Sequence, residues 1–365
     1  ANDYNLNIPR YIEAGEPEDL HDLTAHLNGG TPKRDVDALE SYWSVLPGLR
    51  EALFQDTDRP GYLEPKVETR EVKPTVLEHP AFQDFAETVS AVIQDWQAAH
   101  RPALQALQHG TKPREVVHAL SEDLLQRFAA VPLLDRYTVY QRLMDYWADV
   151  MQDDVYLIAA DGWQEAARPR GVIEDKERKI KEEPDLVIGS GKSAKKYKLD
   201  LIPPELVIAR FFADEQARLE ELRAELETAT RELEEFIEEH DGEEDPLSEV
   251  KSDKGQVTKT EIPKRLKALK ALKGEPDSEE EIVLARYGQL TEAEIKTLII
   301  DDKWQADIRA AIEAEVERIA NELASRVWVL EERYQEPLPA IEREVEELAA
   351  KIAGHLEKMG VRTDD

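Results

Sequence analysis

"YQRLMDYWADVMQDDVYLI" spans residues 140–158 and is apolar on more than one side when it is drawn as a helix. A helix with apolar residues on several sides is usually enclosed by its neighbours. Residues 80–109 and 113–130 carry apolar residues at three- and four-residue steps, which predicts two further helices, each with one apolar face. The sequence therefore predicts a helical domain over residues 14–166, with residues 140–158 at its buried centre.

The chain opens with a short alternating pattern. "NDYNLNIPRYIE" (residues 2–13) alternates apolar and polar side chains until Pro9, which predicts a strand with one buried face. The next hundred residues offer no sheet for this strand, so we expect an orphan strand over residues 1–13. A short helix that ends at Gly29 and Gly30 follows, and a second helix then starts with Thr31 as its N-cap and Pro32 at its first position.

A basic segment at residues 167–203 separates the helical domain from the rest of the chain. Residues 168–198 hold ten Lys or Arg and six Asp or Glu, and "DLVIGSGK" and "KYKLDL" are typical of a small β-hairpin or an ordered loop. Lysine and arginine side chains contact DNA phosphates, so we expect possible DNA contacts here. The residues in question are Arg168, Arg170, Lys195 and Lys196. A solubilising loop is the alternative.

Residues 204–365 predict an extended antiparallel coiled-coil arm. Three segments carry apolar residues at heptad or near-heptad spacing, and Pro337 and Pro339 break the chain before the last of them. A Lys-rich insertion at residues 243–300 interrupts the arm. The seam of the last helix predicts a contact with another subunit, through Ile341, Val345, Leu348, Ile352 and Leu356. An arm that packs only on itself is the alternative.

Composition limits the possible functions. The 365 residues include 79 Asp or Glu against 47 Lys or Arg, for a formal net charge of −32, which argues against a surface built throughout for nucleic acid or anionic lipid. The absence of cysteine excludes disulfides, thiolate metal sites and a cysteine nucleophile, and it favours a cytoplasmic protein. No apolar run reaches the length of a membrane span, so we expect no membrane partner.

Two short motifs resemble elements of an ATPase site, but each departs from the pattern that such a site needs. "LVIGSGKS" (186–193) resembles a phosphate loop, but Leu186 stands where that loop needs its first glycine. "TLIIDD" (297–302) could supply an acidic strand for Mg²⁺, although a helix start with Asp301 or Asp302 as N-cap fits better. The eight histidines do not cluster, and we predict no metal site.

Longer stretches of irregular sequence resemble one protein family. "NDYNLNIPRY" is similar to the segment that closes the catalytic domain of modification (methylation) subunits of type I restriction–modification systems. The resemblance to the long-form members extends over nearly the whole chain. It includes "LTAHLNGGTPKRDVDALESYWSVLPGLREALF", "VYQRLMDYWADVMQDDVYLI", "DLIPPELVIARFF", "YGQLTEAEIKTLIIDDKW" and "LEKMG".

The resemblance implies that the complete subunit is an S-adenosylmethionine-dependent methyltransferase acting on adenine N6 in DNA. In the family, the Gly-rich cofactor motif and the (Asn/Asp)-Pro-Pro-aromatic motif precede the segment with which this chain opens. Here "NIPR" and "DPLS" are the nearest sequences, and both lack the Pro-Pro-aromatic that positions a flipped adenine. We therefore assign no catalytic, cofactor-binding or metal-binding residue, and we expect residues 1–13 to be the severed end of a catalytic domain and the fragment alone to be no enzyme.

The family also implies partners for this chain. Two modification subunits assemble with one specificity subunit on double-stranded DNA, and a restriction subunit can join them. The resemblance thus implies that this chain is a cytoplasmic assembly module, which joins the catalytic domain to the specificity subunit and helps to enclose DNA. The alternative is a free-standing acidic coiled-coil scaffold or a DNA-mimic protein, for which a nearly uniform negative surface is expected.

Overall fold

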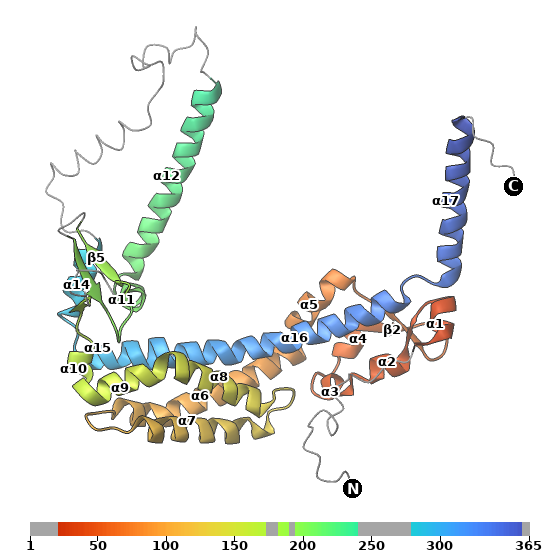
Figure 1. Ribbon diagram of the computed structural model, residues 1–365. Coiled ribbons are helices and arrows are strands. Elements are labelled where there is room, and N and C mark those ends of the chain that lie inside the picture. The colour runs from red at the N-terminus through yellow and green to blue at the C-terminus, as the bar shows by residue number, and fades with distance from the viewer. Residues whose placement is uncertain (1–20, 173–181, 190–193, 240–278, 360–365) are drawn as a thin grey trace, which may run out of the picture. The chain divides into compact units, whose positions relative to one another are not determined.

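The computed structural model describes residues 21–172, 182–189, 194–239 and 279–359. Over these ranges the chain is mainly helical and has two small antiparallel sheets, which confirms the predicted mainly α class (Figure 1). The strand predicted at residues 2–13 and the part of the Lys-rich insertion before residue 279 lie outside the described residues. The chain divides into two compact units, and each is described by itself.

Unit 1 consists of the described residues within Ala1–Gln94, Leu125–Val139 and Ala311–Asp365. Its core includes the apolar face of helix α16 (Ala306–Tyr334), on which Ile312, Leu323 and Val327 are at most 1% exposed. The elements that lie wholly in this unit are α1 (Leu23–Asn28), β1 (Thr31–Pro32), α2 (Lys33–Asp37), α3 (Glu40–Trp43), α4 (Leu49–Leu53), β2 (Phe54–Asp56), β3 (Tyr62–Pro65), α5 (Thr69–Glu78), η2 (Phe128–Ala130) and α17 (Leu338–Lys358).

A three-stranded sheet in unit 1 has the order β1-β3-β2, with β3 antiparallel to both neighbours. Thr31 pairs with Leu63 and is 2% exposed, and helix α2 begins only at Lys33 with Pro32 as N-cap. The prediction that Thr31 caps a helix is therefore wrong, because Thr31 pairs across the sheet instead. Gly29 ends α1 as predicted, at φ 75°, a conformation that favours glycine.

Unit 2 consists of the described residues within Asp95–Leu124 and Tyr140–Ala310. Helices α6 (Pro80–Gln105), α7 (Pro113–Arg127), α8 (Arg136–Tyr146) and α16 contribute to both units. Helices α6 and α7 confirm the helices predicted at residues 80–109 and 113–130. The elements wholly within unit 2 are η3 (Trp147–Met151), α9 (Gln152–Asp161), α10 (Trp163–Ala166), β4 (Arg170–Gly171), β5 (Leu186–Ile188), β6 (Lys195–Lys198), α11 (Pro204–Phe211), α12 (Ala213–Glu239), α14 (Glu279–Tyr287), α15 (Glu292–Lys296) and η6 (Thr297–Gln305).

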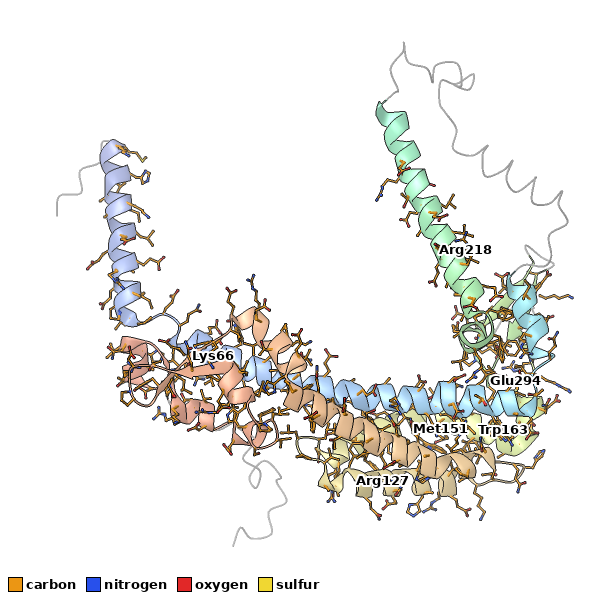
Figure 2. All side chains as sticks on the ribbon, turned by 180° about the vertical axis from the view of Figure 1, so that it is seen from behind. Lys66, Arg127, Met151, Trp163, Arg218 and Glu294 are labelled. Atoms are coloured by element: carbon orange, nitrogen blue, oxygen red, sulfur yellow. The ribbon has the colours of Figure 1, made fainter. Side chains whose placement is uncertain are left out.

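The segment at residues 140–158 forms α8, η3 and α9 and buries one face. Leu143, Met151 and Ile158 are at most 1% exposed, whereas Tyr156 is 56% exposed. Met151 and Trp163, both labelled in Figure 2, belong to the core of unit 2, where Trp163 Nε1 donates to the Leu107 carbonyl at 2.8 Å. The segment is therefore an amphipathic core helix and is not enclosed on all sides.

A buried ion pair holds three segments of unit 2 together. Asp154 in α9 and Lys303 in η6 are 4% and 8% exposed, and the Lys303 ammonium donates to Asp154 Oδ2 at 2.7 Å and to the Leu201 carbonyl at 2.9 Å. Trp304 Nε1 donates to the same carboxylate oxygen at 2.7 Å. Burial raises the pKa of the Asp154 carboxyl, and the Lys303 ammonium and the two donated hydrogen bonds oppose that rise.

Both partners of Asp154 lie in the π-helical turn η6, which continues directly from α15. A π-turn has more residues per turn than an α-helix, so neighbouring side chains diverge by a smaller angle. This geometry lets the adjacent residues Lys303 and Trp304 reach one carboxylate oxygen. A further π-turn, η3, ends just before α9 and shifts the register of the helix that carries Asp154.

The prediction that Asp301 or Asp302 caps a helix is wrong. The helix starts ten residues earlier, where Thr291 and Glu294 form a capping box and residues 292–334 continue through η6 into α16. Asp301 accepts from Arg101 in α6, and Asp302 accepts from both Nε and a terminal nitrogen of Arg210 in α11. These ion pairs join segments that are far apart in sequence, and sequence spacing alone does not reveal them.

Replacing the buried carboxylate tests the structural role of the pair. We expect Asp154→Asn to lower the free energy of unfolding by about 3–5 kcal/mol, because it leaves the Lys303 ammonium buried without a counter-charge. Urea denaturation followed by circular dichroism measures the change. The neighbouring Asp153→Asn removes the same charge from an exposed position and should change little. Equal effects of the two variants would contradict the assigned role.

Candidate functional site

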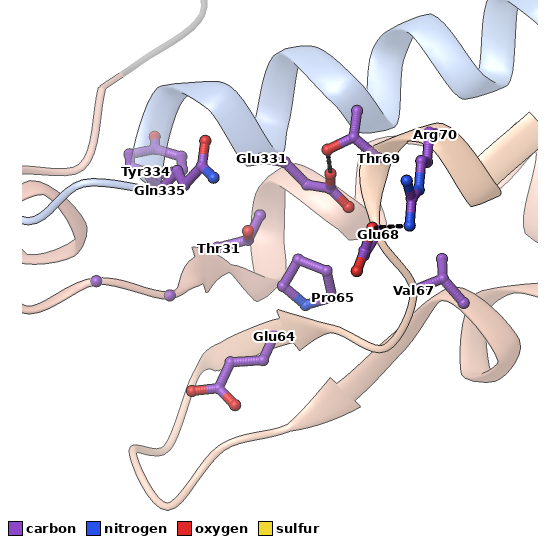
Figure 3. A pocket seen from close by; sticks show the side chains of 12 residues that line it. Thr31, Glu64, Pro65, Val67, Glu68, Thr69, Arg70, Glu331, Tyr334 and Gln335 are labelled. Atoms are coloured by element: carbon purple, nitrogen blue, oxygen red, sulfur yellow. Dashed lines mark hydrogen bonds and ion pairs between the residues drawn. The ribbon is translucent and has the colours of Figure 1, made fainter.

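A cavity of about 660 Å³ lies in unit 1 (Figure 3). Its wall comes from the end of α16, the start of α5, the loop that joins β3 to α5 and the turn between α1 and β1. The volume lies in the range of small-molecule sites in proteins. The charged side chains on the wall are Glu64, Glu68, Arg70 and Glu331, so carboxylates outnumber cations there.

Glu331 is the most buried carboxylate of this wall, at 8% exposure. Its Oε2 accepts from the Thr69 hydroxyl at 2.7 Å, whereas its buried Oε1 has no hydrogen-bond partner among the described residues. Burial raises the pKa of the Glu331 carboxyl, and the hydrogen bond from Thr69 opposes that rise. Glu331 is not among the site residues predicted from the sequence. The available signal was a carboxylate on the apolar face of a helix, four residues after Val327 and three before Tyr334.

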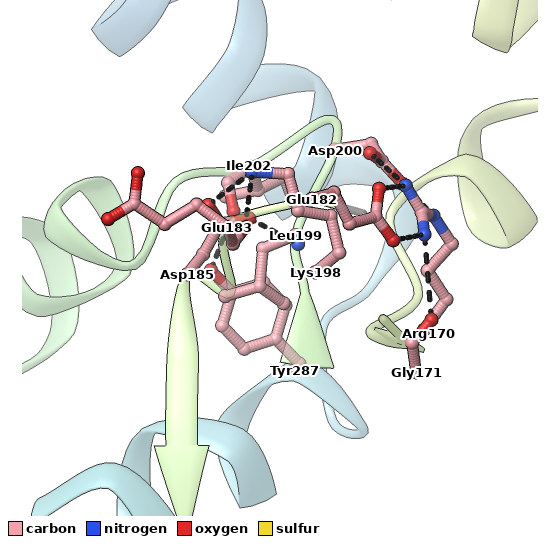
Figure 4. Close-up of polar contacts among 10 residues, drawn as sticks. All are labelled: Arg170, Gly171, Glu182, Glu183, Asp185, Lys198, Leu199, Asp200, Ile202 and Tyr287. Atoms are coloured by element: carbon pink, nitrogen blue, oxygen red, sulfur yellow. Dashed lines mark hydrogen bonds and ion pairs between the residues drawn. The ribbon is translucent and has the colours of Figure 1, made fainter. Parts of the chain in front are cut away.

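The basic segment forms a three-stranded sheet in unit 2, with the order β4-β6-β5 and both pairings antiparallel. The described residues thus confirm a small β structure and add β4 to the expected hairpin. Leu186 in β5 is buried, and Tyr287 in α14 donates its hydroxyl to the Ile202 carbonyl at 2.7 Å (Figure 4). These contacts fix the sheet to the helices of unit 2. Residues 173–181 and 190–193, which include the second half of the phosphate-loop-like motif, lie outside the described residues.

Arg170, one of the predicted DNA contacts, is held by two carboxylates (Figure 4). Its guanidinium donates to both oxygens of Glu182 at 2.6 and 2.9 Å and to both oxygens of Asp200 at 2.5 and 2.8 Å. These bonds raise the pKa of the guanidinium, so its charge is fixed and neutralised locally. Arg170 therefore joins β4 to the segment before β5, which carries Glu182, and to the segment after β6, which carries Asp200.

The other three predicted DNA contacts differ in their surroundings. Arg168 is exposed and pairs with Glu165 at 2.6 Å, one turn earlier. Lys195 and Lys196 make no side-chain ion pair or hydrogen bond with any residue that the structure describes, but they are neighbours on β6 and point to opposite faces of the sheet. Lys196 shares its face with Lys198, which pairs with Asp185, and with Arg170. Lys195 alone lies on the face away from these carboxylates.

The apolar stripe of α17, the predicted subunit contact, is exposed within the described chain. Ile341, Val345, Leu348 and Ile352 are 40–60% exposed, and Leu356 is half-buried. The break predicted at Pro337 and Pro339 is present, since α16 ends at Tyr334 and α17 starts at Leu338. In the view of Figure 2 side chains project from both sides of α17, and α1 is a neighbour of this helix.

Helix α12 also exposes apolar residues, with Leu222 at 48% and Leu226 at 67%. Near its start, α12 lines an apolar cavity of about 350 Å³ with α11 and α14, which includes Phe212, Leu219 and Val283. The arm predicted over residues 204–365 begins with two separate helices, because the helical geometry is broken at Phe212 between α11 and α12. Exposed stripes on α12 and α17 contrast with the buried face of α16.

Protein-family models, curated proteins and solved structures were compared with the chain, and none matches it. The resemblance to type I modification subunits therefore stays a prediction. Among the residues that the structure describes, no group of three or more His, Asp or Glu is placed to hold a metal ion. No helix in the described part is both long and apolar enough to cross a membrane.

We expect Arg170→Ala to loosen the sheet, because it leaves Glu182 and Asp200 facing each other without their cation. The loss of stability should be about 1 kcal/mol or less, since Arg170 is 38% exposed and solvent screens the pair. Hydrogen exchange of the β6 amides measures it and should become faster. Arg168→Ala, which removes an exposed surface pair, is the matched control. Unchanged exchange in Arg170→Ala would show that the sheet does not depend on this residue.

Proposed function

We propose that the chain is an assembly module of a type I restriction–modification DNA methyltransferase subunit, joining a catalytic domain to a specificity subunit in a cytoplasmic complex. The observation that carries this proposal is the exposed apolar stripe of α17. A helix face of this kind is normally covered in the working protein, and here the described chain leaves it uncovered. The adenine-N6 methylation itself belongs, on this proposal, to the part of the subunit that binds S-adenosylmethionine.

Helices supply the expected mode of docking. Residues at coiled-coil spacing on α17 can insert between the residues of another long helix, and a specificity subunit with paired long helices would complete a bundle. The coiled-coil arm expected from the sequence would then form between chains, with α17 and α12 as its exposed helices. A second modification subunit would supply a further copy of the same surfaces.

DNA contact is proposed for the sheet in unit 2, on the face that carries Lys195. The carboxylates of Glu182 and Asp200 neutralise Arg170, and that of Asp185 neutralises Lys198. These carboxylates would repel phosphate on that face. Lys195 lies away from them and is exposed. The acidic DNA-mimic alternative predicts a nearly uniform negative surface, and the exposed Lys195 gives it no support.

Charged substitutions on α17 test the assembly role. We expect Val345→Asp, Leu348→Asp and Ile352→Asp together to abolish co-purification of the complete modification subunit with its specificity subunit. Each of these side chains contributes about 1.5–3 kcal/mol when it is fully buried, and a carboxylate in its place resists burial. Circular dichroism should show an unchanged fold, because the stripe is exposed in the isolated chain.

The matched control places three Asp on the opposite face of the same helix, at Arg343, Glu347 and Ala350. This variant should still assemble. If the stripe variant assembles with normal affinity, α17 only extends from its own chain and the subunit contact lies elsewhere.

The DNA contact is tested by the salt dependence of binding. In the assembled complex, Lys195→Ala should weaken DNA binding and reduce the slope of log K against log salt by about 0.9, the value for one lost phosphate contact. Lys196→Ala should have a smaller effect, because Lys196 shares its face with the carboxylates. Fluorescence anisotropy over a salt series measures both. Unchanged slopes in both variants would remove this sheet from the DNA interface.

A further inference from the structure

The cavity at the end of α16 contains an unsatisfied acceptor. Glu331 Oε1 is buried and has no hydrogen-bond partner among the described residues, although Thr69 satisfies the other oxygen of the same carboxylate. Buried polar atoms are nearly always paired in proteins, so an unpaired oxygen on a residue of a cavity wall points to a ligand that would pair with it. In Figure 3 the Glu331 carboxylate extends from α16 toward Pro65 and Glu68, into the space that these residues line.

The charge of the cavity selects the sign of its ligand. Glu64, Glu68 and Glu331 contribute three carboxylates. Arg70, the single cation among the described residues of the wall, already pairs with Glu68 at 2.9 Å and with the exposed Glu71. An anion would therefore be repelled, and a neutral apolar ligand would leave Glu331 Oε1 unpaired. A cation that donates hydrogen bonds suits both the charge and the orphan oxygen.

The shape of the wall suits an alkyl chain that ends in such a cation. Val67, Pro65 and the ring of Tyr334 supply apolar surface, and the Tyr334 hydroxyl is already used by Asp35 at 3.1 Å and by the Asp22 amide at 3.3 Å. Gly29 and Gly30 line another part of the wall at positive φ. At Gly29 a Cβ atom would come within 3.2 Å of Pro337, so the turn stays without a side chain.

We propose that this cavity binds a primary alkylammonium group, with Glu331 as its counter-ion. The ammonium donates one N–H to Glu331 Oε1, and its alkyl chain packs on the apolar wall. The group could arrive on a free amine or on the lysine side chain of a polypeptide, since both present the same chemistry. Its wall shares no residue with the stripe of α17 or with the sheet in unit 2, so it does not rest on the proposed function.

Titration by calorimetry with the full chain tests the proposal. The probes are cadaverine, as a free amine, and Nα-acetyl-lysine amide, as a polypeptide lysine; acetylation of its side-chain nitrogen gives the neutral control. We expect at least one amine to bind, with affinity at least tenfold weaker in Glu331→Gln. The matched control is Glu332→Gln, which removes the same charge from the adjacent exposed position and should bind as the unaltered chain does.

The two amine probes distinguish the source. Tighter binding of cadaverine indicates a free amine, and tighter binding of Nα-acetyl-lysine amide indicates a lysine side chain. The proposal is overturned if neither amine binds, if the acetylated control binds equally well, or if Glu331→Gln and Glu332→Gln weaken binding equally. Equal weakening would mean only a general attraction of cations to an acidic protein.

A stability measurement shows whether Glu331→Gln remains folded and whether the Glu331 charge destabilises the folded state. The raised pKa of Glu331 means that the unfolded chain ionises first as the pH rises above 4.5, so the charge destabilises the folded state at neutral pH. Glu331→Gln should therefore raise the melting temperature at neutral pH and should have little effect near pH 4. Glu64, Glu68 and Arg70 also face the cavity, and they remain unchanged in both variants. A lower melting temperature at neutral pH would show that Glu331 stabilises the fold and would count against a ligand site.

Discussion

Asp154 accepts two hydrogen bonds in the interior of unit 2, and this buried charge constrains the elements around it. Lys303 must reach the carboxylate from η6, and the Leu201 carbonyl must lie close enough to accept from the same ammonium. The chain that enters α11 is thereby fixed to α9 and η6. Moving any one of these segments would leave a buried charge without its partner, which would lower the free energy of unfolding by about 3–5 kcal/mol. The π-turn in η6 is the local distortion that makes this arrangement possible.

Acidic residues in this chain neutralise many of its cations, and this use of charge explains why the basic segment is less basic than its composition suggests. Arg170 and Lys198 lie on one face of the sheet and are paired with Glu182, Asp200 and Asp185. Pairing of this kind organises the backbone between the strands, and it also removes the positive potential that phosphate requires. The strand register decides which cations lie beside carboxylates. Arg170 and Lys198 do, whereas Lys195 lies on the other face and could contact a phosphate.

Local patterns predicted those parts of the fold that depend on local chemistry. Amphipathic spacing located α6 and α7, a glycine at positive φ ended α1, and Pro337 separated α16 from α17. Predictions failed where long-range partners decide the outcome. Thr31 resembles an N-cap in sequence but pairs with Leu63, and Asp301 accepts from a distant arginine. In the candidate sites, the apolar period predicted the stripe of α17, but no local pattern revealed the Glu331 cavity, because its wall comes from three stretches that are far apart in sequence.

Helices α16 and α17 have similar apolar periods, but the apolar face of α16 is buried and that of α17 is exposed. This difference determines how much apolar surface a partner would have to cover. The period of a helix sets which residues share a face, whereas the rest of the chain decides whether that face is covered. Full burial of the five stripe residues of α17 would contribute on the order of 10 kcal/mol, comparable with the roughly 4–15 kcal/mol cost of association. Helix α17 alone would therefore give a weak complex. A stable one needs a second apolar surface, and the exposed Leu222 and Leu226 of α12 provide one on the same chain.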